Sequence, residues 1–448
     1  MSGSANPRRV AVQTLRDLAQ RQGFSNRVLS AHLERHPTLD KRDRGLITTL
    51  VYGVLRHQAR LDRLLDSAAD KPGKLKGELR TILRVAAFEI VELDRPLAIA
   101  AAEAIKVSRR MDPQGRLKGL ITAVLAAIDR DWPARDAEMQ AGDAVDALSR
   151  RWSLPHWLAA RWVEQLGPEQ ATARAVALSQ PPAIDLRLDL SRATVDEIRE
   201  RLLAEHPGLS FVALPEAAGE QPQCLRVRGG GDLFHGPLFE EGLISIQSLG
   251  SQQAVRILDP APGERILDAC AGMGTKTVQI AEHLRRRGTI LAADASAERI
   301  AELEHGARER AVLDSDLELR TLVADLTAAA EPSPDPFDAV LLDAPCTGLG
   351  NLARHPELRQ TAEAAAVGER AALQATLLRR CAALVRPGGR LVYAVCSLEP
   401  EEGPAIIAAF LADATAAADF TLTAQRSWTP EREHSDGFWL ARLDRRSP

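Results

Sequence analysis

The sequence has few cysteines, few aromatic residues and no long apolar run. Five cysteines in 448 residues are too few for a disulfide framework, and none forms a CxxC pair of the kind that holds zinc. No apolar stretch approaches the roughly 18 residues that a membrane-spanning helix needs. A secretory signal would have an apolar stretch after its basic residues, and no such stretch follows the arginines of MSGSANPRRV. These absences predict a metal-free protein of a reducing compartment, the cytoplasm, with no membrane partner.

Charge is divided unevenly along the chain. Residues 1–130 carry 24 Lys and Arg against 14 Asp and Glu, whereas the whole chain carries 57 against 61. A basic front on an acidic body favours a polyanionic partner such as RNA for the front. A solvated helical surface would show the same imbalance, so charge alone leaves both interpretations open.

The front of the chain has the pattern of a helical bundle. Residues 7–130 repeat apolar residues with a period of roughly 3.6, and basic side chains fall on the outward faces. Asp40 precedes one such stretch as a candidate N-cap. Further helices are expected at about 76–93, 96–110 and 115–130.

The pattern changes twice beyond this front. The sequence DWPA and the polar residues 134–145 that follow it predict a linker. Three tryptophans at five-residue steps, Trp152, Trp157 and Trp162, favour a buried helical core over a platform for stacking bases. From Ile184 the apolar period becomes two, which predicts a small α+β module.

From Gly263 to the C-terminus, short apolar runs such as RILDAC, TILAAD and FDAVLLDAP alternate with helical stretches. Short strands separated by helices predict a parallel, doubly wound sheet. The expected fold class is therefore multidomain. It comprises an all-α N-terminal domain over 1–135, a helical plus small α+β module over 146–245, and a C-terminal α/β doubly wound, Rossmann-like domain over 246–448.

A glycine-rich turn follows the first of these strands, in the segment DACAGMGTKT over 268–277. Glycines let the backbone approach a ligand closely, and the helix that follows offers free N–H groups. The turn matches neither the GxxxxGKS/T loop of phosphate-binding NTPases nor the GxGxxG fingerprint of dinucleotide-binding proteins. Taken alone, it indicates a ligand site of unspecified kind.

Acidic residues close the next three strands. Asp294 is placed to accept hydrogen bonds from ribose hydroxyls, Asp325 lies where an adenine edge is expected, and Asp343 ends the fourth strand in LLDAPC. Because the carboxyl ends of parallel strands meet at one edge of a sheet, these residues are expected to line one crevice. The crevice predicts a nucleoside-bearing cofactor, and leaves NAD and S-adenosylmethionine open.

Two of the five cysteines follow strand ends in the same region. Cys346 comes directly after Asp343-Ala-Pro, and Cys396 comes after Tyr-Ala-Val at the end of the next strand. Both thiols should therefore open into the crevice. A single cysteine would be interpreted as a small buried hydrophobe, and the remaining three are assigned to packing or simple contact. Two thiols beside a carboxyl group require another explanation.

Methylation at C5 of a pyrimidine needs a thiol, a carboxyl group and S-adenosylmethionine together. C5 of cytosine is a poor nucleophile, but a thiolate that adds at C6 breaks the aromaticity and lets C5 attack the sulfonium methyl. A carboxyl group near N3 and N4 relieves the charge that develops on the ring. The thiols therefore favour S-adenosylmethionine over NAD, and the base has to leave any stack to reach such a pocket.

The motifs DACAGMGTKT, LLDAPCTGLG, ARHPEL and YAVCSLEPEE, in this order and spacing, resemble those of the bacterial 16S rRNA cytosine-C5 methyltransferases of the RsmB (Fmu/Sun) type. The basic front, with AVQTLRDL, KRDRGLITTLVYGVLR and AAEAIKVSRR, is similar to their NusB-like RNA-binding domain. The resemblance covers nearly the whole chain. It implies an enzyme that uses S-adenosylmethionine to methylate C5 of one cytosine in small-subunit rRNA through a covalent Cys–C6 adduct, and a monomer is expected.

Position by position, the resemblance makes Cys396 the nucleophile and Cys346 the second cysteine, which assists release of the methylated base, with Asp343 beside them. His355 in the RHP motif would line the RNA side or simply begin a helix. The implied cofactor-binding residues are Cys270, Ala271, Gly272, Met273, Gly274, Thr275, Lys276, Asp294, Asp325 and Asp343.

The chain departs from the family pattern in places. The usual CAAPGGKT is changed at Met273 and Thr275, and the usual Val-Gln-Asp ahead of the domain ends in Ser248. Two alternatives stay open: the same chemistry on tRNA or another rRNA, and an RNA-binding assembly or antitermination factor with an inactive methyltransferase fold. The altered glycine turn favours the inactive factor, whereas the retention of both thiols counts against it.

Overall fold

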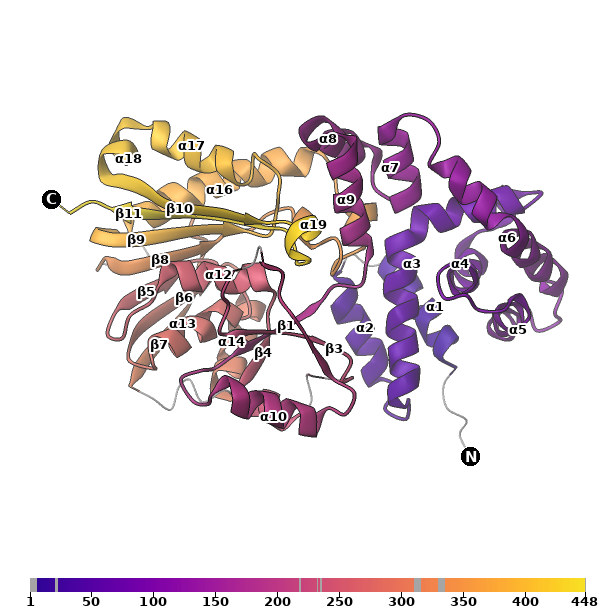
Figure 1. The fold of residues 1–448 in the computed structure, drawn as a ribbon, viewed down its shortest axis with the longest axis horizontal. Coiled ribbons are helices and arrows are strands. Elements are labelled where there is room, and N and C mark those ends of the chain that lie inside the picture. Colours follow the sequence, from indigo (N-terminus) through magenta and orange to yellow (C-terminus); the bar gives the residue numbers. More distant parts are fainter. Residues whose placement is uncertain are drawn as a thin grey trace. The chain divides into compact units, whose positions relative to one another are not determined.

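The computed structural model describes residues 6–20, 23–216, 219–231, 233, 236–309, 316–328 and 335–447. Contacts divide the chain into two compact units (Figure 1). Unit 1 comprises Met1–Gln180 and Leu352–Ala362, and unit 2 comprises Pro181–Asn351 and Glu363–Pro448. A short segment of unit 1 is therefore inserted into the chain of unit 2.

Unit 1 is helical, and its described residues contain no strand, as the apolar period predicts. Its α-helices are α1 (Pro7–Gln20), α2 (Ser25–Glu34), α3 (Lys41–Ala68), α4 (Gly77–Val91), α5 (Leu97–Ser108), α6 (Lys118–Met139), α7 (Ala144–Trp152), α8 (His156–Leu166), α9 (Pro168–Ser179) and α15 (Leu358–Thr361), and a 3₁₀ turn spans Pro72–Lys74. Asp40 caps α3 as expected, because its carboxylate accepts a hydrogen bond from the N–H of Asp43 at 2.7 Å. No helix in the described part of the chain combines the length and the apolar character that a membrane crossing requires.

The predicted break at DWPA is wrong, because α6 continues through Pro133 to Met139. Pro133 is exposed, so the carbonyl that loses its helical partner can bond to water instead. Beyond the proline, Asp136 is buried and accepts a hydrogen bond from the Arg60 guanidinium at 2.5 Å. This buried ion pair holds the last turns of α6 against the bundle, and the chain leaves the helix only between Met139 and Ala144.

The expected tryptophan core is confirmed for one residue of three. Trp162 is 2% exposed in α8. Trp152 and Trp157 are half-buried, and the indole N–H of Trp157 donates to the carbonyl of Ala362 at 3.3 Å. Because α7 ends at Trp152 and the chain turns at Ser153, the five-residue spacing does not place the three rings on one helix face.

The inserted segment of unit 1 is held by buried arginines. Arg359 of α15 is 4% exposed and donates to the carbonyl of Trp152 at 2.7 Å and to that of Leu178 at 2.9 Å. These carbonyls end α7 and α9, where the helix dipole is negative. Arg56 of α3 donates to the carbonyl of Ala353 at 2.8 Å. Arg359 thus satisfies carbonyl groups at the C-terminal ends of α7 and α9, which lie far from it in sequence.

Unit 2 begins with a small antiparallel sheet in the order β2-β3-β1-β4. Its elements are β1 (Ile184–Leu188), α10 (Val195–Glu205), β2 (Ser210–Val212), β3 (Cys224–Arg228), α11 (Pro237–Glu240) and β4 (Ile244–Ile246). Thr194 and Glu197 form a capping box at the start of α10. The two-residue period from Ile184 therefore predicts this module correctly.

The large sheet of unit 2 has the order β10-β11-β9-β8-β5-β6-β7. Its strands are β5 (Arg265–Asp268), β6 (Gly288–Asp294), β7 (Leu317–Val323), β8 (Phe337–Asp343), β9 (Val385–Val395), β10 (Phe420–Trp428) and β11 (Phe438–Arg445). Strands β5 to β9 are parallel, as predicted, but β11 pairs antiparallel with both β9 and β10 and makes the sheet mixed. The connection between β10 and β11 is too short for the crossover that parallel strands need, so they form an antiparallel pair.

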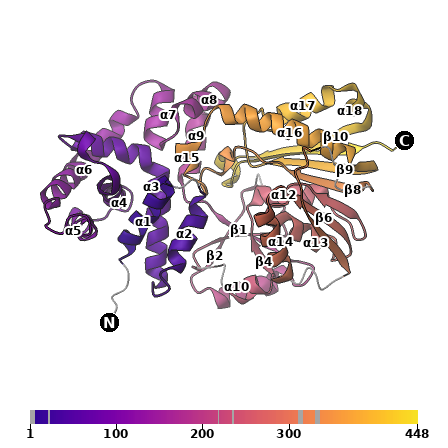
Figure 2. The same cartoon turned by 180° about the vertical axis from the view of Figure 1, so that it is seen from behind.

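Helices cover both faces of the large sheet. They are α12 (Leu249–Leu258), α13 (Thr275–His283), α14 (Ala297–Glu309), α16 (Ala365–Ala383), α17 (Pro404–Ala412), α18 (Ala414–Asp419) and α19 (Pro430–Glu433), with a 3₁₀ turn over Leu349–Asn351. Buried side chains of α12, α13 and α14 share one core with Ile266 of β5, and these three helices lie together in Figure 2. Those of α16 and α17 share the other core with Leu267. This doubly wound arrangement confirms the predicted fold class.

The expected three-part division of the chain stays a prediction. Contacts group residues 146–180 with unit 1 and the small sheet with the large one. Asp189, just after β1, pairs with Arg286, just after α13, at 2.6 Å and so joins the small sheet to the domain of the large one. Asp185 of β1 pairs with Arg226 of β3 at 2.6 Å within the small sheet.

Candidate active site

The glycine turn between β5 and α13 has an open face and a packed face. Gly272 and Gly274 both have positive φ angles, +57° and +84°, which glycine adopts without strain. A Cβ at Gly272 would meet no atom within 4 Å, whereas a Cβ at Gly274 would come within 2.6 Å of Leu303. Gly272 therefore leaves space for a ligand, and Gly274 lets the turn pack on α14. Met273 between them is 53% exposed.

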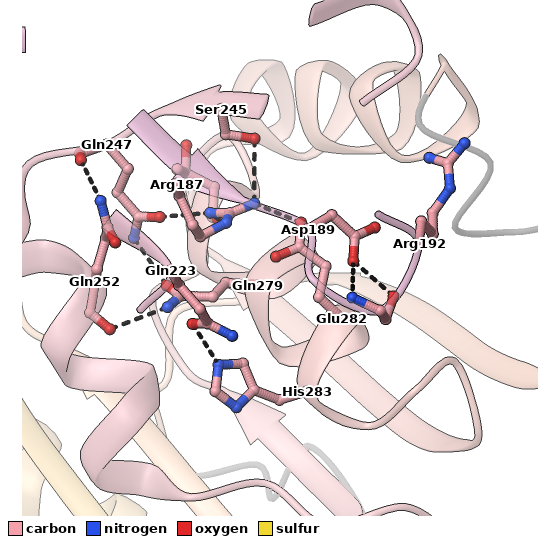
Figure 3. Close-up of polar contacts among 12 residues, drawn as sticks. Arg187, Asp189, Arg192, Gln223, Ser245, Gln247, Gln252, Gln279, Glu282 and His283 are labelled. Atoms are coloured by element: carbon pink, nitrogen blue, oxygen red, sulfur yellow. Dashed lines mark hydrogen bonds and ion pairs between the residues drawn. The ribbon is translucent and has the colours of Figure 1, made fainter. Parts of the chain in front are cut away.

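The first turn of α13 is held by buried polar groups from the small sheet. Arg187 of β1 is 1% exposed and pairs with the carboxylate of Glu282 on α13 at 2.8 Å (Figure 3). Its guanidinium also donates to the carbonyl of Thr275 at 2.9 Å. Gln247 accepts a further bond from Arg187 and donates to Gln279 of α13 at 3.0 Å (Figure 3). The helix that follows the glycine turn is thereby fixed, a coupling that the sequence pattern does not predict.

Asp294 and Asp325 have different surroundings. Asp294 ends β6, and its carboxylate accepts hydrogen bonds from the N–H of Gly272 at 3.0 Å and of Ser296 at 2.9 Å. It therefore joins the end of β6 to the glycine turn. Asp325 lies two residues beyond the end of β7, is exposed, and accepts hydrogen bonds from Thr327 that lower its pKa. Within the described residues, no side-chain hydrogen bond or ion pair joins Asp325 to the other candidate residues.

Asp268 is a site residue that the strand-end reasoning missed. It ends β5, is fully buried, and accepts a hydrogen bond from the Thr277 hydroxyl at 2.7 Å. Its other carboxylate oxygen has no hydrogen-bond partner in the described structure. Burial raises the pKa of Asp268 to about 7. Its position in the sequence could have identified it, because Asp268 ends the first strand just as Asp294 and Asp343 end later strands.

Lys276 joins the glycine turn to the end of β8. Its ammonium lies 2.5 Å from the carboxylate of Asp343 and 5.9 Å from the centre of the Phe438 ring. Burial lowers the pKa of Lys276, but the charge and hydrogen bond of Asp343, followed by the charges of Asp268 and Cys396, raise it above its usual value. A cation is therefore maintained within electrostatic reach of Cys396.

The two predicted cysteines meet at the edge of the sheet. Cys346 follows β8, Cys396 follows β9, and their sulfur atoms lie 3.2 Å apart. Both are half-buried, whereas Cys224 and Cys381 are buried. The hydrogen bond with Cys396, then burial, then the charges of Cys396 and Glu402 raise the pKa of Cys346 well above its usual value.

Cys270 and His355 each have surroundings of their own. Burial raises the pKa of the Cys270 thiol well above its usual value, so it stays protonated and packs under the glycine turn. His355 belongs to unit 1, where its ring meets that of Phe24 edge-on at 5.1 Å and its Nδ1 lies 3.3 Å from the Glu357 carboxylate.

Two family models match the chain. One, described as 16S rRNA methyltransferase RsmB/F, matches residues 255–444, and the other, described as the NusB family, matches residues 5–130. The first range covers the large sheet with the glycine turn and both cysteines, and the second covers the helical front. Fold and match together define a Rossmann-like methyltransferase domain preceded by a NusB-family domain.

Relatives match over nearly the whole length. The chain is 32% identical to "Probable ribosomal RNA small subunit methyltransferase B" of Synechocystis sp., over 97% of this chain and 98% of the relative. It is 30% identical to "Ribosomal RNA small subunit methyltransferase B" of Pseudomonas putida, over 98% of each chain. The crystal structure of PH0851 shares the fold, with a TM-score of 0.79 at 24% identity over 99% of this chain and 100% of that one. The chain belongs to the ribosomal RNA small subunit methyltransferase B family, which confirms the resemblance in the motifs.

Proposed function

We propose that this protein transfers a methyl group from S-adenosylmethionine to C5 of one cytosine in 16S rRNA, with cytosine 967, the usual target of the family, as its substrate. The observation that carries the proposal is the pair of thiols 3.2 Å apart at the carboxyl edge of the sheet. Lys276 and Asp343 lie at the same edge. The substrate implies a cytoplasmic enzyme with RNA as its partner.

The residues at the glycine turn fit S-adenosylmethionine. Gly272 leaves open space, and Asp294 closes β6 where ribose hydroxyls are expected. When bound, the cofactor supplies an electrophilic methyl group on a sulfonium. The proposed contacts are Cys270, Ala271, Gly272, Met273, Gly274, Thr275, Lys276, Asp294, Asp325 and Asp343.

Cys396 is the proposed nucleophile because it directly follows β9, beside Cys346, in the motif that carries this role in the family it resembles. The thiolate is the reactive form of a cysteine. The thiolate adds to C6 of the base, forming an S–C6 bond and moving the ring electrons toward C5. Asp343, the ion-pair partner of Lys276, is the carboxyl group proposed to meet the N3 and N4 edge of the base.

Cys346 is the proposed second thiol, which assists release. After methyl transfer, the C5 proton is lost to water, its electron pair restores the C5–C6 double bond, and Cys396 leaves as a thiolate. The thiol of Cys346, 3.2 Å away and with a raised pKa, can donate a hydrogen bond to that departing thiolate. Release is therefore assisted by a group that stays protonated.

Methyl transfer to unmodified 16S rRNA tests the proposal. The protein is incubated with labelled S-adenosylmethionine and the RNA, and bisulfite sequencing locates the product. One new 5-methylcytosine is expected, at cytosine 967, and rRNA that already carries this modification is the matched control. Label in tRNA or at another rRNA position would correct the substrate. Tight RNA binding with no transfer would favour an assembly or antitermination factor with an inactive fold.

A further inference from the structure

A buried carboxylate lies behind the two thiols and is used by no step of the mechanism above. Glu402, between β9 and α17, is 0% exposed. Its carboxylate accepts hydrogen bonds from the N–H of Thr347 at 2.8 Å and from the Thr347 hydroxyl. It also accepts bonds from the Ser397 hydroxyl at 2.5 Å and from the side-chain amide of Gln374 at 3.1 Å. One carboxylate thus gathers four donors.

Three of these donors come from the two cysteine loops, and the fourth, the amide of Gln374, belongs to α16. Thr347 follows Cys346 directly in the loop after β8, and Ser397 follows Cys396 directly in the loop after β9. The two loops are distant in sequence, and Glu402 bonds to the residue next to each thiol. The backbone of Glu402 is held in turn, because the hydroxyl of Tyr393 donates to its carbonyl at 2.5 Å.

Burying a carboxylate is unfavourable unless its oxygens are fully hydrogen-bonded. Within the described residues, the structure shows no Lys, Arg or His within ion-pair distance of Glu402, so the four donors alone compensate its burial. If this position served packing alone, an apolar side chain of similar size would suffice and would need no hydrogen-bond donors around it. The donors surround the thiols, which indicates that Glu402 orders the loops that carry them.

We propose that Glu402 is a positioning residue, which holds the two cysteine loops in register so that Cys346 and Cys396 face one base. The catalytic consequence rests on the proposed function, but the register of the thiols does not. A shift of about 1 Å in a reacting group can cost about 100-fold in rate. The inference can therefore be tested both by catalysis and by the distance between the sulfur atoms.

Glu402→Gln is the principal variant. Glutamine keeps the shape but replaces one acceptor oxygen by an NH2 group that faces donors. We expect kcat for rRNA to fall about 100-fold while KM for the RNA and the affinity for S-adenosylmethionine change less than about threefold. Glu318→Gln is the matched control, because Glu318 lies on β7 in an exposed pair with Arg320 and should leave all three values unchanged.

A second readout needs neither RNA nor activity. The thiol oxidant diamide takes up the hydrogen of each thiol as Cys346 and Cys396 join in a disulfide, which peptide mass mapping identifies. We expect rapid formation of this disulfide in the wild-type protein and in Glu318→Gln, and at least tenfold slower formation in Glu402→Gln. If the wild type fails to methylate rRNA but this difference holds, the proposed function fails and the positioning role stands.

Milder variants cover the case in which Glu402→Gln does not fold. Ser397→Ala and Thr347→Val each remove one hydroxyl donor and should lower kcat and the rate of disulfide formation about tenfold, whereas Thr347→Ser, which keeps the hydroxyl, should restore both. In the Glu402→Gln background, Ser397→Ala should add no further loss. Wild-type values of kcat and disulfide formation in Glu402→Gln, or in both milder variants, would overturn the inference. Loss of cofactor affinity in parallel with both readouts would also overturn it, since that would indicate a general effect on folding.

Discussion

The loops after β8 and β9 each present one half-buried thiol, and the sulfur atoms lie 3.2 Å apart. Their electrostatic surroundings differ. The Lys276 ammonium interacts electrostatically with Cys396, whereas the hydrogen bond with Cys396, then burial, then the charges of Cys396 and Glu402 raise the pKa of Cys346. The raised pKa favours the protonated form of Cys346, which suits the release role proposed for it.

Removal of the Cys396 thiol should have the largest effect. Cys396→Ala leaves no nucleophile at C6, so methyl transfer should fall roughly 10⁴-fold or more. Single-turnover transfer from labelled S-adenosylmethionine measures the loss, and cofactor affinity, which should stay unchanged, is the control. A rate within tenfold of the wild type would show that the base is activated in another way.

Removal of the Cys346 thiol should give a different defect. Cys346→Ala can still form the adduct and methylate it, but release slows, so turnover should fall about 100-fold and protein should accumulate on the RNA. A denaturing gel detects the covalent complex with unmodified natural RNA. Cys381→Ala, which removes a buried thiol from α16, is the matched control and should leave no complex. Free methylated RNA at the normal rate from Cys346→Ala would contradict the proposed release role.

The ion pair between Lys276 and Asp343 should have the next largest effect. In Lys276→Met the Asp343 carboxylate loses its partner at the sheet edge that carries both thiols, so single-turnover methyl transfer should fall about tenfold. Lys276→Arg keeps the positive charge and should retain most of the activity. Equal transfer rates in all three proteins would show that this ion pair does not contribute to the reaction.

The smallest effect concerns stability and Asp268, which lies outside both cysteine loops. Its pKa is raised by burial to about 7, so the folded state holds a proton that the unfolded state has already lost. Its contribution to stability is present at low pH and is lost as pH rises through about 7. We expect Asp268 to lower the free energy of unfolding by about 1 kcal/mol between pH 6 and pH 8. Asp268→Asn should lack this decline in denaturant titrations, and parallel pH profiles would contradict the raised pKa.

The sequence predicts the parts of the site that depend on local pattern. Short apolar runs locate the parallel strands, and residues directly after them, such as Asp294, Asp343 and Cys396, must lie at the carboxyl edge of the sheet. The glycine turn can also be predicted from the sequence, because its backbone conformation depends on Gly272 and Gly274 and on no distant residue. These features need no knowledge of distant partners.

The features that the sequence pattern does not predict depend on contacts between distant segments. Glu402 stands in a visible motif, but its bonds to Thr347 and Ser397 exist only once two loops meet. Arg359 directly follows the motif ARHPEL, yet its partners are carbonyls of α7 and α9 in the helical unit. The continuation of α6 through Pro133 likewise depends on the buried ion pair beyond it. Local propensity cannot reveal such partners.

The central claim is that Cys396 and not Cys346 forms the covalent bond to the base, and trapping tests it most directly. A 16S rRNA fragment with 5-fluorocytosine at position 967 is incubated with S-adenosylmethionine and the protein. Because fluorine at C5 cannot leave as a proton does, the adduct persists after methyl transfer and its peptide can be mapped by mass. The account predicts the modified base on Cys396. A base attached to Cys346, or no adduct with an otherwise active enzyme, would contradict it.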